Sequence, residues 1–421
     1  MPSMICIFED ELIGNFLPLV YTRPVYDLKC GVMSFKERIH QSFPRAGIVL
    51  QCRDYLVDYV SLRNPSCAIN QVPSEKCLFL NGRILDIRNL ARLLPVELNK
   101  DVLYVNNGHV VAAHLSGANL QAMTQCLNHP LAAKHFGNLE SIEVDVNLVT
   151  YPWDLVHRNR EMLLHDGESL LARKGRRLGK IWKGAQIIGT KNVVIGKGSN
   201  VMPGAVLDAT DGPIIIGEDV KVFPQATIIG PSFVGNNSLV KIGASIYEDC
   251  SIGAWCTVGG EVECSIIHGY SNKQHSGFLG QSYVGKWVNL GADTNTSNLK
   301  NNYGHVRVTV GGRQIDTGSQ FAGLFMGDHS KSAINTMFNT GTVVGVSCNV
   351  AMAGFPQKSI PSFAWITGEG HVETFDLRRA LEVAKRVMAR RDVALSTVEE
   401  ELFKKVFDLT REERAYPDID G

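Results

Sequence analysis

The segment that decides the fold runs from residue 216 to residue 262 and reads IGEDVKVFPQATIIGPSFVGNNSLVKIGASIYEDCSIGAWCTVGGEV. Branched aliphatic residues recur at every sixth position, and a small or compact residue follows each of them four positions later. The aliphatic positions are Ile216, Val222, Ile228, Val234, Val240, Ile246, Ile252 and Val258. No amphipathic helix has a period of six, and an alternating strand has a period of two. A fixed short repeat of this kind predicts the stacked coils of a parallel β-solenoid.

The same beat extends beyond this segment in both directions. It occurs earlier at Ile195, Val201 and Leu207, and later at Met326, Ser332, Phe338, Val344 and Val350. Eighteen residues would make one three-sided coil, with aliphatic side chains stacked inside and small residues at the corners. The alternative is a run of short antiparallel strands, which should show hairpin dipeptides at irregular spacing. The unbroken register of the aliphatic positions favours the solenoid, although its handedness does not follow from the period.

Composition limits the classes of partner. The chain has 421 residues, of which 44% are hydrophobic and 20% charged, so we expect a globular protein of two or three domains. Lys and Arg number 42, as do Asp and Glu, so no global charge favours nucleic acid or an anionic membrane. No apolar run approaches the roughly 18 residues that span a bilayer. The ten cysteines form no CxxC pair, which favours reduced thiols and a cytoplasmic location.

The pattern along the chain predicts four parts. Apolar runs at 4–8, 46–50, 77–80 and 102–105 alternate with helical patterns at 34–42 and 87–94, which predicts an α/β domain with a parallel sheet covered on both faces. We place this domain at residues 1–170, a linker at 171–186, the solenoid at 187–368 and a helical tail at 369–421. Within the tail, Ser396 and Glu399 form a capping box ahead of an amphipathic helix.

Two polar segments are expected to interrupt the solenoid, at about 264–283 and at 295–320. The first contains His275 within a group of polar residues that a solenoid core does not need. Loops that project from a rigid scaffold commonly carry function. Without further information, His275 is a surface histidine or a functional one.

Residues 273–291, KQHSGFLGQSYVGKWVNLG, followed by 296–302, resemble the acetyltransferase half of the bacterial bifunctional family that makes UDP-N-acetylglucosamine. That family carries a histidine before an aromatic–Leu/Ile–Gly triplet, then an Asn–aliphatic–Gly–Ala turn and a second asparagine. These elements are His275, Phe278–Gly280, Asn289–Ala292 and Asn298 here. The resemblance implies a left-handed parallel β-helix of the hexapeptide-repeat class and a homotrimer.

The resemblance also implies a reaction. His275 would act as the general base that takes a proton from a sugar amine as the nitrogen attacks the thioester of acetyl-CoA. The implied substrate-binding residues are Lys241, Lys273, Phe278, Asn289, Asn298 and Arg307. Phe278 replaces the family's tyrosine, and the family's phosphate-binding lysine has no clear counterpart. A metal site of the carbonic-anhydrase-like solenoids would need a His-x4-His pattern, which this chain lacks.

Residues 15–29, NFLPLVYTRPVYDLK, follow the first predicted strand, where α/β folds place ligand loops. They resemble a degenerate sugar-nucleotidyltransferase signature, in which a glycine-rich turn leads into Thr-Arg and then a lysine. Thr22, Arg23 and Lys29 keep that order and would neutralise phosphates. Leucine and proline replace the glycines of the turn.

A second departure from this family lies at the end of a predicted strand. The family's strand-end triplet finishes in a metal-binding aspartate, whereas Asn81-Gly82-Arg83 puts arginine in that place. Asn81 and Arg83 are therefore counted with the phosphate-binding candidates. If the domain uses Mg²⁺, the candidate ligands are Asp27, Asp86 and Asp145.

The whole pattern predicts a bifunctional-type sugar-phosphate transferase. Its α/β domain would transfer a nucleotidyl group from a nucleoside triphosphate to a sugar 1-phosphate, and its solenoid would N-acetylate an amino-sugar phosphate. Two alternatives stay open: an acyltransferase only, or a non-catalytic trimeric scaffold that binds a nucleotide sugar.

Overall fold

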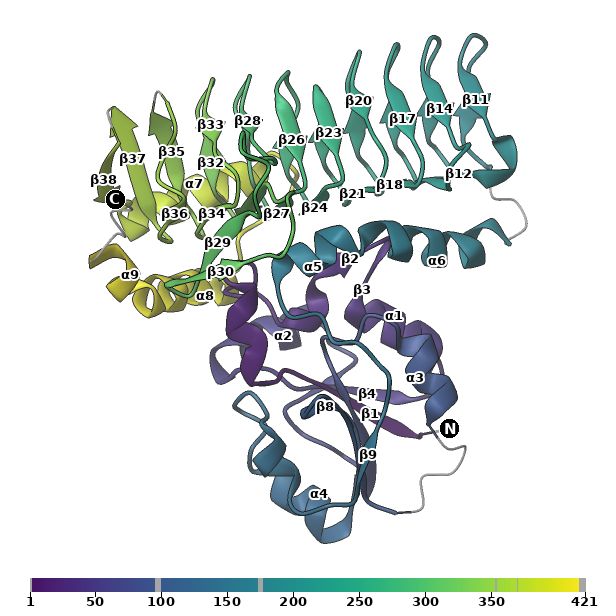
Figure 1. The fold of residues 1–421 in the computed structure, drawn as a ribbon, viewed down its shortest axis with the longest axis vertical. Coiled ribbons are helices and arrows are strands. Elements are labelled where there is room, and N and C mark those ends of the chain that lie inside the picture. Colours follow the sequence, from purple (N-terminus) through teal and green to yellow (C-terminus); the bar gives the residue numbers. More distant parts are fainter. Residues whose placement is uncertain (1, 95–99, 173–176, 353, 369, 416–421) are drawn as a thin grey trace.

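The computed structural model describes residues 2–94, 100–172, 177–352, 354–368 and 370–415. Figure 1 shows a long solenoid with an α/β domain below it, and three C-terminal helices at the end of the solenoid remote from its first coil. Helix α6 (Asn159–Leu171) lies along the underside of the solenoid, between the two domains. No helix of the described residues has the length and apolar character to cross a membrane.

The N-terminal domain is built on one seven-stranded sheet of order β5-β4-β1-β6-β8-β7-β9. The strands are β1 (Met4–Phe8), β4 (Gly47–Leu50), β5 (Ala68–Ile69), β6 (Lys76–Asn81), β7 (Val102–Asn106), β8 (His109–Ser116) and β9 (Ser141–Glu143). Its helices are α1 (Phe35–Ser42), α2 (Val57–Arg63), α3 (Ile87–Leu93), α4 (Gly117–Thr124), α5 (Pro152–His157) and α6. Every strand and helix that we predicted in this domain is present, within one or two residues.

The sheet is mixed and not wholly parallel, which corrects the sequence prediction. β8 runs antiparallel to both β6 and β7. The β7–β8 turn has Asn107 and Gly108 at φ 48° and 80°. Asn-Gly with two positive φ angles is the strongest short signal for a two-residue hairpin. The sequence therefore contained the signal for the antiparallel strand that we missed.

The solenoid is a left-handed parallel β-helix with three flat faces. Face 1 contains β10 (Lys180–Ile181), β13 (Asn200–Val201), β16 (Lys221–Val222), β19 (Leu239–Val240), β22 (Thr257–Val258), β25 (Asn272–Lys273), β32 (Lys331–Ser332), β35 (Asn349–Met352), β37 (Ala364–Gly368) and β38 (His371–Thr374). Face 2 contains β11 (Gln186–Ile188), β14 (Val206–Asp208), β17 (Thr227–Ile229), β20 (Ser245–Ile246), β23 (Glu261–Glu263), β26 (Phe278–Gly280), β28 (Asn295–Thr296) and β33 (Met337–Phe338). Face 3 contains β12 (Val193–Ile195), β15 (Ile214–Ile216), β18 (Ser232–Val234), β21 (Cys250–Ile252), β24 (Ile266–Gly269), β27 (Tyr283–Lys286), β31 (Leu324–Met326), β34 (Thr342–Val344) and β36 (Ser359–Ile360).

The six-residue beat maps onto this prism as predicted. Ile216 pairs with Val234 and Val234 with Ile252, so one face repeats every eighteen residues. The aliphatic side chains of the beat are buried and form one continuous core cluster inside the prism. Three cysteines, Cys250, Cys256 and Cys348, belong to that cluster. Burial raises the pKa of the Cys256 and Cys348 thiols to about 12, as expected for compact core residues.

The solenoid begins earlier than we predicted, because β10 lies within the segment that we read as linker. The segment 264–283 also differs from its prediction. It does not interrupt the solenoid, because β24, β25 and β26 continue the three faces. Only the spacing changes: Ile252 pairs with Ile267, fifteen residues on, where eighteen would be regular. A shortened coil keeps its hydrogen bonds while the sequence period is lost.

The second predicted excursion is confirmed as the antiparallel hairpin β29 (Arg307–Val310) and β30 (Arg313–Asp316), which projects from the solenoid. The predicted helical tail is confirmed as α7 (Leu377–Ala389), α8 (Thr397–Leu409) and α9 (Arg411–Ala415). Ser396 and Glu399 make both hydrogen bonds of the predicted capping box.

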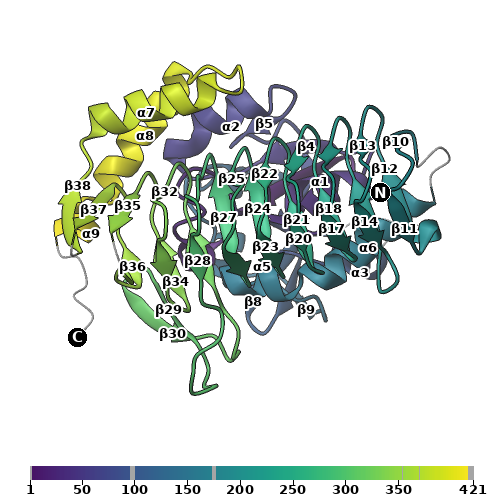
Figure 2. The ribbon, with the colours of Figure 1, turned by 90° about the horizontal axis from the view of Figure 1, so that it is seen from above.

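Helix α8 packs between the solenoid and helix α2 of the N-terminal domain, as Figure 2 shows from above. It covers a ladder of rings at one corner of the prism, where Trp255, Tyr270, Trp287 and His329 all have φ near +60°. Successive rings stack, and Phe403 of α8 meets the His329 ring edge-on at a centroid distance of 4.8 Å. Helix α6 packs on face 3 through Leu163, which contacts Ile215 and Phe233.

Candidate functional sites

Arg83, at the position where the family has a metal-binding aspartate, forms a buried ion pair with Asp10 at the end of β1. Arg83 is 1% exposed, and its Nε lies 2.9 Å from Asp10 Oδ1. Asn81 Nδ2 donates to Asp10 Oδ2 at 2.9 Å, and Arg83 Nη1 donates to the Val149 carbonyl. Asn81 and Arg83 are thus brought together, but their polar groups bind Asp10 and the backbone.

The signature loop is fixed by a second buried pair that sequence reasoning missed. Glu9 is fully buried and accepts from Arg53 Nε at 3.0 Å. Arg53 Nη2 then donates to the carbonyls of Val20 and Arg23, at 2.7 and 2.9 Å. The Glu9–Arg53 pair therefore fixes the path of the chain that carries Thr22 and Arg23. An acidic residue directly after a buried strand was the available signal.

Thr22 and Arg23 point at the solenoid. Thr22 Oγ1 donates to Asp328 Oδ2 at 2.8 Å, and the Arg23 guanidinium forms an ion pair with the same oxygen. Burial alone would raise the pKa of Asp328, but the Arg23 charge and its hydrogen bond outweigh it and hold that pKa below its usual value. The two residues predicted to neutralise a phosphate therefore bind a carboxylate of this same chain.

Asp27 and Lys29 also lie at the contact between the domains. Asp27 forms an ion pair with Lys36 at 2.7 Å, and its carbonyl oxygen lies 3.0 Å from His268 Nε2. The Lys29 backbone N–H donates to the Tyr283 hydroxyl at 2.9 Å. Asp27 is not among the residues that line the pocket of the other two metal candidates.

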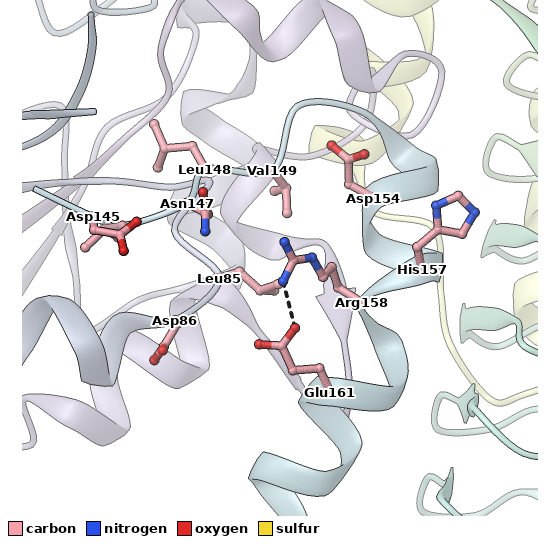
Figure 3. Close-up of a pocket in the computed structure, with 11 residues that line it drawn as sticks. Leu85, Asp86, Asp145, Asn147, Leu148, Val149, Asp154, His157, Arg158 and Glu161 are labelled. Atoms are coloured by element: carbon pink, nitrogen blue, oxygen red, sulfur yellow. Dashed lines mark hydrogen bonds and ion pairs between the residues drawn. The ribbon is translucent and has the colours of Figure 1, made fainter. Parts of the chain in front are cut away.

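Asp86 and Asp145 line one pocket of about 410 Å³ in the N-terminal domain. Figure 3 shows both carboxylates on the side formed by the loops that follow the strands, and Arg158 and Glu161 on the side formed by α6. Arg158 Nη1 lies 2.9 Å from Glu161 Oε2. Asn147, from the loop that follows β9, adds an amide to the lining.

This donor set fits a hard divalent cation. Mg²⁺ is commonly bound by one or two carboxylates, with water and substrate phosphates completing the octahedron. Asp86, Asp145 and the Asn147 side-chain oxygen are of the required type and face one cavity. No group of three or more His, Cys, Asp or Glu residues that would hold a metal by themselves occurs in the part of the chain that the structure describes.

His275 lies at the corner between β25 and β26 and is exposed. Its imidazole has no hydrogen-bond partner among the described residues. Asp293 follows on the next coil, where its N–H donates to the Ser276 carbonyl at 3.1 Å. An accessible imidazole on a rigid corner can take a proton from a bound amine.

Lys273 supports this corner from inside the prism. It pairs with Val258 on face 1 and occupies the inward position that aliphatic residues hold in other coils. Its Nζ donates to the carbonyls of Gly259, His275 and Ser276, at 3.2, 2.6 and 3.2 Å. Burial lowers the pKa of Lys273 to about 8. The ammonium group therefore holds the loop that carries His275 and is not presented to a ligand.

Phe278 and Asn298 lie together on face 2. A Cβ built on Gly280 would collide with both the Phe278 ring and Asn298 Nδ2, so the two side chains close over that glycine. Asn298 Nδ2 donates to the Gln281 side chain. Asn289 is elsewhere, on face 1, where its Oδ1 accepts from Asn272 Nδ2 at 3.3 Å.

The contacts of Lys241 and Arg307 do not involve His275. The Lys241 ammonium lies 5.8 Å from the centre of the Phe223 ring, on an earlier coil. Arg307 is exposed on the β29–β30 hairpin and donates to Gln314 at 3.4 Å. Of the predicted acyl-site residues, only Lys273 contacts the loop of His275 directly.

Comparison with known proteins finds a matching family for the N-terminal part of the chain. The model of the family described as "Sugar nucleotidyl transferase" matches residues 5–175. The bifunctional sugar-1-phosphate nucleotidylyltransferase/acetyltransferase of Sulfurisphaera tokodaii is 31% identical over 145 residues, which are 33% of this chain and 35% of that protein. The bifunctional protein GlmU of Methanocaldococcus jannaschii is 26% identical over 143 residues, 34% of this chain and 29% of that protein. The matched part thus spans about a third of the length of these relatives.

Among solved structures, an Arabidopsis UDP-N-acetylglucosamine acyltransferase aligns with 56% of this chain and 92% of its own, at 13% identity and a TM-score of 0.23. So distant a likeness carries no argument about this chain. Residues 5–175 are thus similar to the sugar nucleotidyl transferase family, and a parallel β-helix follows them in the chain.

Proposed function

We propose that the chain is a two-site transferase of nucleotide-sugar synthesis, with nucleotidyl transfer in the N-terminal domain. The observation that carries this proposal is the pocket of Figure 3, which Asp86 and Asp145 line together with Glu161 of α6, within a domain that matches sugar nucleotidyl transferases. In this reaction a phosphate oxygen of a sugar 1-phosphate attacks the α-phosphorus of a nucleoside triphosphate, and pyrophosphate leaves.

The side chains of the pocket divide into two roles. Asp86 and Asp145 would hold Mg²⁺, which neutralises phosphate charge when it is bound. Asn147 and Arg158 offer hydrogen-bond donors to phosphate or sugar oxygens, and Glu161 fixes the direction of the Arg158 guanidinium. Thr22 and Arg23 take no part in this arrangement, because Asp328 holds them.

Asp145→Asn should lower nucleotidyl transfer by about 10²–10³-fold, because one charge that stabilises the transition state is removed. The measurement is pyrophosphate release from a panel of nucleoside triphosphates and sugar 1-phosphates, with and without Mg²⁺. Asp58→Asn, an exposed aspartate on α2, is the matched control and should keep full turnover. Nucleotide binding without Mg²⁺ dependence, together with no pyrophosphate from any pair, would instead favour a binding domain that lacks catalysis.

The second candidate activity is acyl transfer from acetyl-CoA to an amino-sugar phosphate at the solenoid. The observation that favours it is the exposed His275 imidazole on a corner that Lys273 fixes from inside. As the amine nitrogen forms a bond to the thioester carbon, His275 takes the proton from nitrogen. The carbon–sulfur bond then breaks, and the proton passes to the sulfur of CoA. The family resemblance adds a homotrimer with acyl-CoA between solenoids.

His275→Ala should lower acetyl transfer by about 10²–10⁴-fold, the usual contribution of a general base, while CoA affinity stays nearly unchanged. His305→Ala removes another exposed histidine, on the segment before β29, and is the control. The assay follows free thiol release from acetyl-CoA with a panel of amino-sugar phosphates. Unchanged turnover in His275→Ala would remove this residue from the reaction without bearing on the N-terminal pocket.

A further inference from the structure

A separate pocket of about 350 Å³ lies between α1, α3 and α6 of the N-terminal domain. A glutamine and an alanine contribute to its lining, but its chemistry is set by Arg38, Arg88, Arg92, His165, Ser42 and Ser169. No carboxylate is among the described residues that line it. In a chain whose formal net charge is zero, such a wall is a local concentration of positive charge and hydrogen-bond donors.

Arg38 forms the floor of this pocket and is 1% exposed. Its Nη2 donates to Asp166 Oδ2 at 2.8 Å and to the Cys30 carbonyl at 2.7 Å. Its Nη1 is buried without any hydrogen-bond partner. Leaving a buried charged donor unpaired costs about 1–3 kcal/mol or more, so this nitrogen lacks an acceptor that a ligand would supply.

Arg88 is oriented by two successive hydrogen bonds, through His165 to Asp166. Its Nε donates to His165 Nε2, and because an arginine Nε cannot accept, the proton of the imidazole lies on Nδ1. His165 Nδ1 then donates to Asp166 Oδ1 at 3.3 Å. Asp166 therefore sets the direction of two guanidinium groups, one through a direct contact and one through His165.

Arg92 completes the pocket at its exposed edge and has no ion-pair partner among the residues that the structure describes. The carboxylate nearest to Arg88 is Glu168, at 3.9 Å from Nη1, and its side chain is 77% exposed. Arg88 Nη2 donates to the His165 carbonyl at 3.2 Å. The donors that remain for a ligand are therefore Arg88 Nη1, the Arg92 guanidinium and the unpartnered Arg38 Nη1.

We propose that this pocket binds a phosphate group, carried by a phosphate monoester, a nucleotide or inorganic phosphate. Planar guanidinium groups match phosphate oxygens in pairs. The Ser42 and Ser169 hydroxyls already donate to backbone carbonyls at 3.0 Å, so the arginines supply the donors to the ligand. A volume of about 350 Å³ is at the lower end of the roughly 300–1,000 Å³ that is usual for small-molecule sites.

The phosphate pocket and the pocket of Figure 3 lie along one face of α6. Arg158 and Glu161 line the pocket of Figure 3, and His165 and Ser169 line the phosphate pocket, at helical spacings of three and four residues. Glu161 and His165 are separated by roughly 6 Å along the helix axis. The proposal does not depend on either proposed activity, because it rests on the donor set alone.

Arginine modification by phenylglyoxal, read by peptide mass spectrometry, tests the site on the full chain. Saturating inorganic phosphate should slow the modification of Arg88 and Arg92 at least about fivefold, while the exposed Arg45 reacts at the same rate. Sodium chloride at equal ionic strength is the reference. Protection that is equal at Arg45, or that chloride reproduces, would overturn the site.

Calorimetric titration of variants gives the second measurement. Arg92→Gln should weaken phosphate binding about tenfold, the scale of one charged hydrogen bond, and Arg45→Gln should leave it unchanged. Glucose 1-phosphate and ATP as further probes identify which carrier of the phosphate binds most tightly. Asp145→Asn should keep this binding even if it loses turnover, so failure of the phosphate site and failure of nucleotidyl transfer are distinguishable. Equal affinity in Arg92→Gln and the unmodified chain would contradict the proposal.

Discussion

Lys286 differs from Arg23, Arg53 and Arg83, each of which forms an ion pair with a carboxylate. It lies at the end of β27 beside Asp328, and its Nζ makes no hydrogen bond to another described residue. Burial, and next the nearby Arg23 charge, lower the pKa of Lys286 to about 8. The folded chain therefore binds this proton more weakly than the unfolded chain, whose lysines titrate near 10.5.

Lys286→Met should stabilise the chain by about 1–2 kcal/mol at pH 7, less than the full shift implies because the side chain is partly exposed. Below pH 8 the lysine is charged in both states and the penalty is complete. As the pH rises to 10.5 the penalty disappears, so the advantage of the variant should shrink. Urea unfolding at pH 7 and pH 10 measures the difference. Lys405→Met, on the exposed side of α8, should show no such change, and a less stable Lys286→Met at pH 7 would contradict the argument.

The roles of the candidate site residues stay predictions, but the structure shows where these residues lie. His275 is exposed at a corner, and Asp86 and Asp145 line one pocket. The role of Arg23 was not readable, because its partner Asp328 is about three hundred residues away in the sequence. Thr22 and Arg23 keep the order of the nucleotidyltransferase motif. In this structure they bind the Asp328 carboxylate, where a phosphate was expected.

At the scale of elements, adjacent solenoid coils approach too closely for any side chain at certain positions. A Cβ on Gly253 would lie well inside contact distance of the His268 carbonyl carbon and oxygen on the next coil. These are backbone atoms within a hydrogen-bonded sheet, so they cannot move aside without separating β21 from β24. Glycine is required here by the spacing of the coils.

Gly253→Ala should therefore destabilise the chain by about 1–3 kcal/mol, the usual cost of overpacking. Gly14→Ala is the matched control, since a Cβ on Gly14 meets nothing within 4 Å. Guanidinium unfolding followed by circular dichroism compares the two. A Gly253→Ala variant as stable as Gly14→Ala would mean that the coils separate at little cost.

Local signals predicted several elements, although the Asn107-Gly108 hairpin was missed. The six-residue beat predicted the solenoid, and Ser396 with Glu399 predicted the start of α8. Prediction failed at 264–283, because a coil three residues shorter loses the period while its backbone pairing continues. Lys273 also misled the prediction, because a charged residue is not expected inside the prism. Its inward position is explained by the three carbonyl groups that accept from its Nζ.

At the scale of the whole molecule, the Arg23–Asp328 pair joins the N-terminal domain to the solenoid. The exposed fractions of Arg23 and Asp328 are 1% and 6%, so neither charge has water as an alternative partner. Thr22 and the Lys286 backbone N–H complete the bonds to the aspartate. We therefore expect the unfolding of one domain to depend on the other.

Arg23→Met and Asp328→Asn should each destabilise the chain by about 3–5 kcal/mol, because each leaves a buried polar group without its partner. The double variant should lose much less than the sum of the two. A double-mutant cycle by urea unfolding measures the coupling. Lys404→Ala, which breaks the exposed pair with Glu401, is the control and should leave the stability nearly unchanged. Strict additivity of the two buried variants would show that the pair does not couple the domains.

The cysteines inside the prism can be used to follow how its coils separate. Cys250 and Cys256 lie within one coil and Cys348 lies several coils later, and each is buried with a raised thiol pKa in the intact coil stack. An alkylating reagent reaches a given thiol only while the turns around it have come apart. Timed labelling followed by peptide mapping would therefore show whether the coils unfold one after another from one end or in a single cooperative step.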